Sequence, residues 1–139
     1  MLKLLASTIT FATASLVNAQ SATYIVEPGH TFVYFEVVHS STSTTRGRFD
    51  DVRGTITLNQ AAKTGHAEIV VDPASVSSGI VPFDEHLRNA DFLNAAAFPK
   101  VTFAGDSFTF EGEKTTALSG VLTLLGKAQP ATLLATRFN

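Results

Sequence analysis

Apolar side chains recur at every second position over most of the chain after residue 20, and this period constrains the fold more than any other feature. Successive side chains of a β-strand point to opposite faces, so a period of two predicts strands. The segment 31–39 shows the pattern clearly, with one face formed by Val33, Phe35, Val37 and His39. Its other face is also largely apolar. We therefore expect this strand either to be covered on both sides or to lie against a helical segment.

The same alternation continues along the chain and predicts roughly eight short antiparallel strands. Gly54 lies inside one of these patterns, which predicts a bulge or kink that lets a sheet curve. An all-β barrel or sandwich follows, and a barrel of about eight strands is wide enough to be filled by side chains or to hold one small ligand. The expected further strands are 24–26, 47–58, 65–71, 100–104, 107–111, 117–125 and 131–138.

One short helix interrupts the strand pattern after Pro82, a residue that suits the first turn of a helix. Phe83, Leu87 and Ala90 recur at i, i+4 and i+7 and predict a single apolar stripe. Pro99 ends any continuation.

The first 19 residues have the features of a secretory signal peptide. Lys3 is the single charge, residues 4–17 are apolar or carry hydroxyl groups, and Ala19 precedes the expected cleavage point. The alternative is an uncleaved anchor, but the run is short and rich in Ser and Thr where about 20 apolar residues are needed. We predict a leader at 1–19, one domain at 20–139, and a periplasmic protein, with secretion as the alternative.

Charge and cysteine content exclude several functional classes. Loss of Lys3 with the leader takes the net charge from -2 to -3, and no cluster of basic residues exists to neutralise nucleic-acid phosphates. The chain has no cysteine, so an exported domain depends on its core instead of disulfides. After removal of the leader we expect no membrane span.

Several short motifs occur in a specific order, and together they resemble the YceI-like family. They are Glu27-Pro28-Gly29-His30-Thr31, Gly47-Arg48-Phe49, Val52-Arg53-Gly54, His86-Leu87-Arg88, Asp91-Phe92-Leu93, Phe98-Pro99 with Phe103, and Gly120-Val121-Leu122-Thr123-Leu124 with Gly126 and Pro130. The resemblance implies a small, often exported, lipocalin-like barrel that holds a long isoprenoid or another lipid. It favours a binding protein over an enzyme.

Members of the family usually continue for some tens of residues past the position of Asn139, which adds about two strands to a barrel of about eight. We therefore expect an antiparallel lipocalin-like barrel that is incompletely closed at its C-terminus. The sequence leaves three explanations open. The chain is a truncated product, the barrel closes with fewer strands, or another chain completes it, as in a homodimer.

The expected ligand is a long-chain isoprenoid, an isoprenoid quinone or another lipid, and no other cofactor is predicted. Burial of each CH₂ group is worth about 0.8 kcal/mol, so a long tail binds without specific hydrogen bonds. The alternative is that the inward side chains only pack against one another. The predicted apolar lining is Val33, Phe35, Val37, Phe49, Ile56, Leu58, Ile69, Val71, Phe92, Phe103, Leu122 and Leu124.

We predict a polar mouth formed by His39, His86 and Arg88. In the alternative, Arg88 pairs with Asp84, four residues earlier on the helix, or caps backbone groups. The four histidines show no metal-ligand spacing, so no metal site is predicted.

No motif of nucleophilic or phosphate chemistry occurs, and we predict that the protein is not an enzyme. Two alternatives to a carrier remain. One is a small exported enzyme or redox accessory protein that uses a bound quinone. The other is a filled barrel with a structural or stress-related role.

Overall fold

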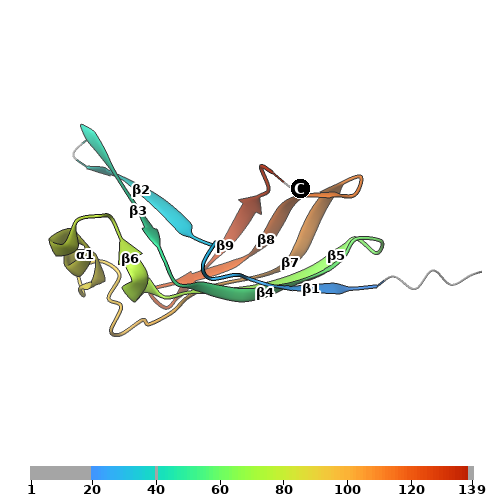
Figure 1. Ribbon diagram of the computed structural model, residues 1–139, viewed down its shortest axis with the longest axis horizontal. Coiled ribbons are helices and arrows are strands. Elements are labelled where there is room, and N and C mark those ends of the chain that lie inside the picture. The colour runs from blue at the N-terminus through green and yellow to red at the C-terminus, as the bar shows by residue number, and fades with distance from the viewer. Residues whose placement is uncertain (1–19, 40, 138–139) are drawn as a thin grey trace, which may run out of the picture.

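The computed structural model describes residues 20–39 and 41–137, which form two antiparallel sheets and one short helix. The predicted leader lies outside the described residues. Figure 1 shows the larger sheet as a long curved surface, with a hairpin of the smaller sheet rising from one end of it. The larger sheet has the order β1 (Ala22–Ile25), β4 (Val52–Asn59), β5 (Thr64–Val71), β7 (Val101–Glu111), β8 (Lys114–Leu124) and β9 (Lys127–Leu134).

The smaller sheet has the order β2 (Val33–His39), β3 (Ser43–Phe49) and β6 (Val76–Ser77). A short 3₁₀ turn at Pro73–Ser75 leads into β6, and helix α1 (Val81–Arg88) packs beside β6 (Figure 1). The predicted class, antiparallel all-β with one short helix, is confirmed. Within the described residues the sheets do not close into a barrel, as expected for incomplete closure.

The segment 47–58 was predicted as one strand, with Asp50-Asp51 read as a turn within it. The single strand is wrong, because the chain leaves β3 at Phe49 and enters the other sheet at Val52, whereas the turn at Asp50-Asp51 is correct. Asp50 and Asp51 form the corner between them. The Asp50 N–H donates to the Ser75 carbonyl oxygen (3.2 Å), and the Asp51 N–H donates to the Ser75 hydroxyl oxygen (3.0 Å). Because these groups bond to the 3₁₀ turn instead of to a neighbouring strand, the sheet is interrupted there.

Gly54 was predicted to mark a bulge or a kink, and there is no bulge, because the pairing of β4 with β5 runs through it without a register shift. Gly54 has φ +155°, and a Cβ at this position would collide with the Glu68 carbonyl oxygen. Glycine is therefore required for close approach of two strands. Register shifts occur instead where β7 pairs with β8, between Gly105 and Ser107 and between Thr109 and Phe110, and β7 is one continuous strand where two were expected.

Strand β9 begins at Lys127, four residues earlier than predicted. The predicted strand began directly after Pro130, whereas in the structure Pro130 lies inside the strand. The Ala135 N–H donates to the Thr116 carbonyl oxygen (2.9 Å), so in this register alternate N–H groups point toward β8. The backbone nitrogen of Pro130 falls on the other side. Within the part of the sheet that is described, Pro130 therefore removes no hydrogen bond.

Helix α1 has Pro82 in its first turn, as predicted, and ends at Arg88. Ala90 lies beyond this end and is exposed, so it does not extend the apolar stripe. Leu87 is the buried apolar residue of the helix. A core cluster on the larger sheet consists of Ala67, Phe103 and Leu118.

Replacement of Gly54 by alanine should lower the free energy of unfolding by about 3 kcal/mol, because the new Cβ adds a steric collision to a backbone conformation that disfavours side chains. Gly112→Ala is the matched control. Gly112 also has a positive φ, +64°, but nothing lies near its missing Cβ, so we expect a loss of about 1 kcal/mol. Urea unfolding of both variants measures the difference, and equal losses would contradict the close approach.

Candidate functional site

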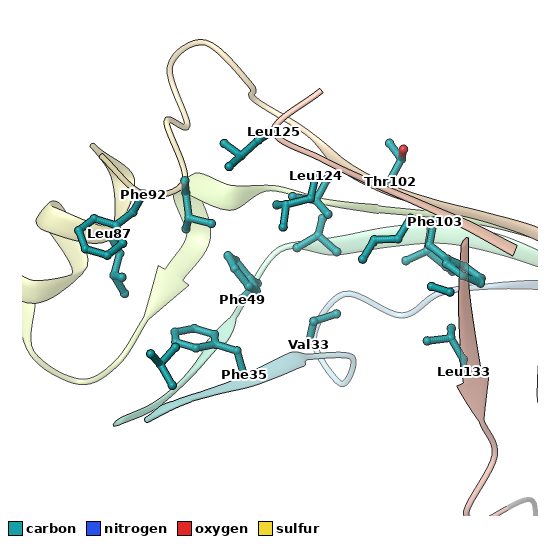
Figure 2. A pocket seen from close by; sticks show the side chains of 17 residues that line it. Val33, Phe35, Phe49, Leu87, Phe92, Thr102, Phe103, Leu124, Leu125 and Leu133 are labelled. Carbon is teal, nitrogen blue, oxygen red and sulfur yellow. The ribbon is translucent and has the colours of Figure 1, made fainter. Parts of the chain in front are cut away.

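An apolar cavity of about 580 Å³ lies between the larger sheet, the β2–β3 hairpin and the segment that contains α1. Figure 2 shows side chains from all three parts pointing toward the same space. The hairpin contributes Val33, Phe35, Val37 and Phe49, and the α1 segment contributes Leu87, Phe92 and Leu93. The larger sheet and the β8–β9 turn contribute Ile69, Val71, Val101, Thr102, Phe103, Leu122, Leu124, Leu125, Ala131 and Leu133.

The lining is almost entirely hydrocarbon. Thr102 carries the one polar side chain among the 17 that line the cavity, and none of the 17 is charged. The rings of Phe35 and Phe49 pack together, with centroids 5.6 Å apart, and form part of the hairpin wall. The volume is about four times the ~150 Å³ of an apolar cavity that binds one benzene molecule. Such a site can bind a long apolar chain by removing it from water. The filled interior that was one alternative is not formed by the residues that the structure describes.

The cavity is open on one side. Val37 on β2 is 52% exposed, Leu133 on β9 is 50% exposed, and Phe92 after α1 is 46% exposed, although all three line the cavity. β2 and β9 are both edge strands within the described residues. The opening therefore lies where each sheet presents an unpaired edge.

Ten of the twelve residues predicted as apolar lining do line this cavity. The exceptions are Ile56 and Leu58, which both lie on β4. Leu58 is buried elsewhere, and Ile56 packs against the core cluster of Ala67, Phe103 and Leu118. The alternation correctly predicted that Ile56 and Leu58 point to an apolar interior, but it could not predict that this part of β4 lies away from the cavity. Whether the ten bind a ligand stays a prediction.

Seven lining residues were not predicted: Leu87, Leu93, Val101, Thr102, Leu125, Ala131 and Leu133. For some of them the sequence contains a pattern from which the inward orientation could have been predicted. Leu87 is on the apolar stripe of the predicted helix, while Ala131 and Leu133 share one face of the last strand. Leu125 has no such signal, because it lies in the turn between β8 and β9 with φ +51°.

The predicted polar mouth is only partly formed. The ring of His86 is exposed and packs edge-on against the ring of Phe92, at 4.7 Å between centroids, so His86 contacts a lining residue. The side chain of His39 lies outside the described part of the structure. Arg88 does not line the cavity.

Arg88 instead attaches α1 to the chain before it. Its Nε donates to the Ala74 carbonyl oxygen (2.8 Å), and its Nη2 donates to the Val76 carbonyl oxygen (3.0 Å). The predicted ion pair with Asp84 is therefore wrong, whereas the alternative of capping backbone groups describes Arg88 correctly. Asp84 has a different partner, since its Oδ1 accepts from the N–H (2.7 Å) and the hydroxyl (2.5 Å) of Ser78.

These contacts lower the pKa of Asp84 below its usual value. The hydroxyl of Ser78 has the largest effect because its hydrogen bond favours the charged carboxylate; burial acts in the opposite direction, and the Ser78 N–H and the charge of Arg88 add to the lowering. Asp84 and Arg88 thus hold α1 in place from both sides. The helix in turn carries Leu87 into the cavity wall.

No group of three or more His, Asp or Glu side chains in the part of the chain that the structure describes could hold a metal ion. No helix between residues 20 and 137, as far as they are described, is long and apolar enough to cross a bilayer.

Comparison with known proteins gives a consistent result. The family model for the YceI-like domain matches residues 24–139. Protein YceI of Salmonella newport (strain SL254) is 36% identical over 132 residues, which cover 93% of this chain and 67% of that protein. The chain thus spans about two thirds of the length of this relative.

Two solved structures have a similar fold. The Campylobacter jejuni YceI protein is 28% identical, with a TM-score of 0.59, and the match covers 78% of this chain and 64% of that one. Burkholderia cenocepacia BcnA has a TM-score of 0.63 at 22% identity, over 73% of this chain and 63% of that one, and supports the fold alone.

Acid should weaken the attachment of α1. Because the pKa of Asp84 is lowered in the folded state, its contribution to stability is present above the unfolded value of about 3.9 and is lost as the pH falls through the folded pKa. We expect Asp84→Asn to be less stable than the parent at neutral pH, with a difference that shrinks below about pH 4. Urea unfolding across this range measures it. Glu85→Gln removes an exposed carboxylate from the same helix, and an equal effect in this control would contradict the role of Ser78.

Proposed function

The chain belongs to the YceI-like family, and we propose that it is a binding protein that holds the tail of a long-chain isoprenoid, an isoprenoid quinone or another lipid in its apolar cavity. The single observation that carries this proposal is a large hollow lined by hydrocarbon where a solid core was the alternative. Cavities of 300–1,000 Å³ with mostly apolar walls are typical ligand sites.

The energy of such binding comes from the tail. Burial of on the order of ten methylene groups is worth about 8 kcal/mol at about 0.8 kcal/mol each. That free energy corresponds to a micromolar complex before the cost of ordering the tail is subtracted. No specific hydrogen bond is needed, which agrees with a lining whose one polar side chain is Thr102.

The head group of the ligand lies outside the cavity in this proposal. A charged or strongly polar head would lose its hydration inside the hollow without gaining a partner, because no lining side chain is charged. At the open side it stays in water, near Phe92 and the exposed ring of His86.

We favour binding over catalysis. A reaction of the bound molecule would need an acid, a base or a nucleophile at the ligand, and the lining formed by the described residues offers no ionisable side chain. The leader-like residues 1–19 support a place in the periplasm, with secretion as the alternative.

Organic extraction of the purified protein, followed by mass spectrometry, should release a long-chain apolar molecule at about one per protein chain, the ratio expected for a single cavity. A folded protein that carries no such molecule, and takes none up from lipid vesicles, would contradict the proposal.

Ala131→Phe should reduce ligand content at least tenfold, because a benzene-sized ring takes about a quarter of the hollow. The matched control is Ala104→Phe, which places the same ring at an exposed position of β7 that does not line the cavity. Mass spectrometry of both variants gives the occupancy, and a thermal unfolding curve shows whether each is folded. Equal occupancy in the two variants would place the ligand elsewhere.

A further inference from the structure

The two-residue turn between β8 and β9 has an unusual residue at its first position. Leu124 pairs with Lys127, so the turn consists of Leu125 and Gly126, with φ +51° at the first and +69° at the second. Positive φ at both positions is the backbone of a type I′ turn, which favours Asn, Asp or Gly. For a leucine the left-handed conformation is disfavoured about tenfold in equilibrium constant, because its Cβ approaches the following carbonyl oxygen.

The other non-glycine residues with positive φ in the described part of the chain differ from Leu125. Ser41 and Lys63 are exposed and lie in turns, and Asn94 belongs to a residue type that tolerates this conformation. Leu125 is half-buried, and its side chain lines the hydrocarbon wall of the cavity. Strained backbone of this kind is concentrated at functional sites.

Contacts outside the turn hold Leu125 in place. A Cβ at Gly126 would lie 2.9 Å from the ring of Phe98, so the turn lies directly against the segment that follows α1. In that segment the Phe98 N–H donates to the Asn94 carbonyl oxygen (2.9 Å). Figure 2 shows the side chain of Leu125 in the cavity wall, on the same side as that of Leu124. The side chain of Leu125 therefore cannot turn away from the cavity unless the turn leaves Phe98.

The core gains little from Leu125. Leu122 and Ala131, on the two strands that the turn connects, pack against the core cluster of the larger sheet, and Leu125 is not among the residues that do so. One side of its side chain faces the cavity, where no protein atoms contact it. The packing of the fold thus does not explain a leucine at a position that disfavours it.

We propose that Leu125 is a specificity-determining residue for the bound tail. Its side chain takes up room at the side of the cavity next to Phe98 and contacts the tail there, and this contact offsets the unfavourable backbone conformation. The inference rests on the proposed function and deepens it, because it names a residue that sets which tail fits. The side chain of Leu125 is similar in size to one isoprene unit, so without it a tail longer by about one such unit would fit.

Leu125→Asn tests the strain and the contact together. Asparagine has nearly the same size as leucine and is favoured in this turn before Gly126. We expect the thermal unfolding midpoint of lipid-free protein to rise by about 4 °C, because the strain is relieved. The affinity for farnesol, measured by equilibrium dialysis, should fall about tenfold, because an amide would face the hydrocarbon tail.

Leu124→Asn is the matched control, since it makes the same replacement at the neighbouring lining residue, which lies in β8 and does not have a positive φ. Here we expect both the unfolding midpoint and the affinity to fall. If Leu125→Asn lowers the midpoint as much as this control does, the side chain of Leu125 serves the fold and the proposal is overturned.

Leu125→Gly tests the specificity. Glycine also adopts positive φ readily but leaves the space of the side chain open. Geranylgeraniol is longer than farnesol by one isoprene unit, and the ratio of their affinities should rise about tenfold in favour of geranylgeraniol relative to Leu125→Asn. The same dialysis measurement gives this ratio, and an unchanged ratio would overturn the proposal.

The results also distinguish this proposal from the proposed function. If the parent protein binds farnesol and Leu125→Asn binds it equally well, the carrier stands and the role of Leu125 is wrong. If the parent binds neither alcohol and releases no long-chain molecule on extraction, the proposed function is wrong and this proposal fails with it.

Discussion

The corner at Asp50 and Asp51 is the constraint on which the rest of the structure depends. Both backbone N–H groups bond to Ser75, and the Asp51 carbonyl oxygen accepts from the Asp72 N–H (3.0 Å). These bonds take the chain out of one sheet and into the other within two residues. Without the corner, β3 and β4 would continue as one strand, the hairpin would not face the larger sheet, and no space would be enclosed (Figure 1).

The hollow exists because the walls are held apart by polar contacts at their margins. Arg88 bonds to two backbone carbonyl groups, and Asp84 bonds to Ser78, so α1 is fixed beside β6 and cannot move inward to fill the space. The rings of Phe35 and Phe49 pack against each other in the hairpin wall. Apolar surface that would normally collapse is therefore left as a cavity, which a lipid tail is suited to occupy (Figure 2).

The open edge and the open cavity are two aspects of one geometry. A barrel has no edges, whereas a sheet that stops short of closure leaves both an unpaired strand and an exposed interior. Within the described residues β9 and β2 are edge strands, and Leu133 and Val37 on the same strands are partly exposed lining residues.

The sequence by itself determined which face of each strand is apolar, because the period of two is a property of the backbone and does not depend on neighbours. It predicted the faces of β2 in this way, and it predicted the helix at Pro82 from a different signal, the proline and the helical spacing of Phe83 and Leu87. Ile56 and Ile69, on adjacent strands, both pack against the core cluster, and only the tertiary structure decided that Ile69 also borders the hollow while Ile56 does not. It also decided that Arg88 serves the backbone instead of a ligand. Local patterns cannot specify these outcomes, because they depend on which distant segments the corner at Asp50 and Asp51 brings together.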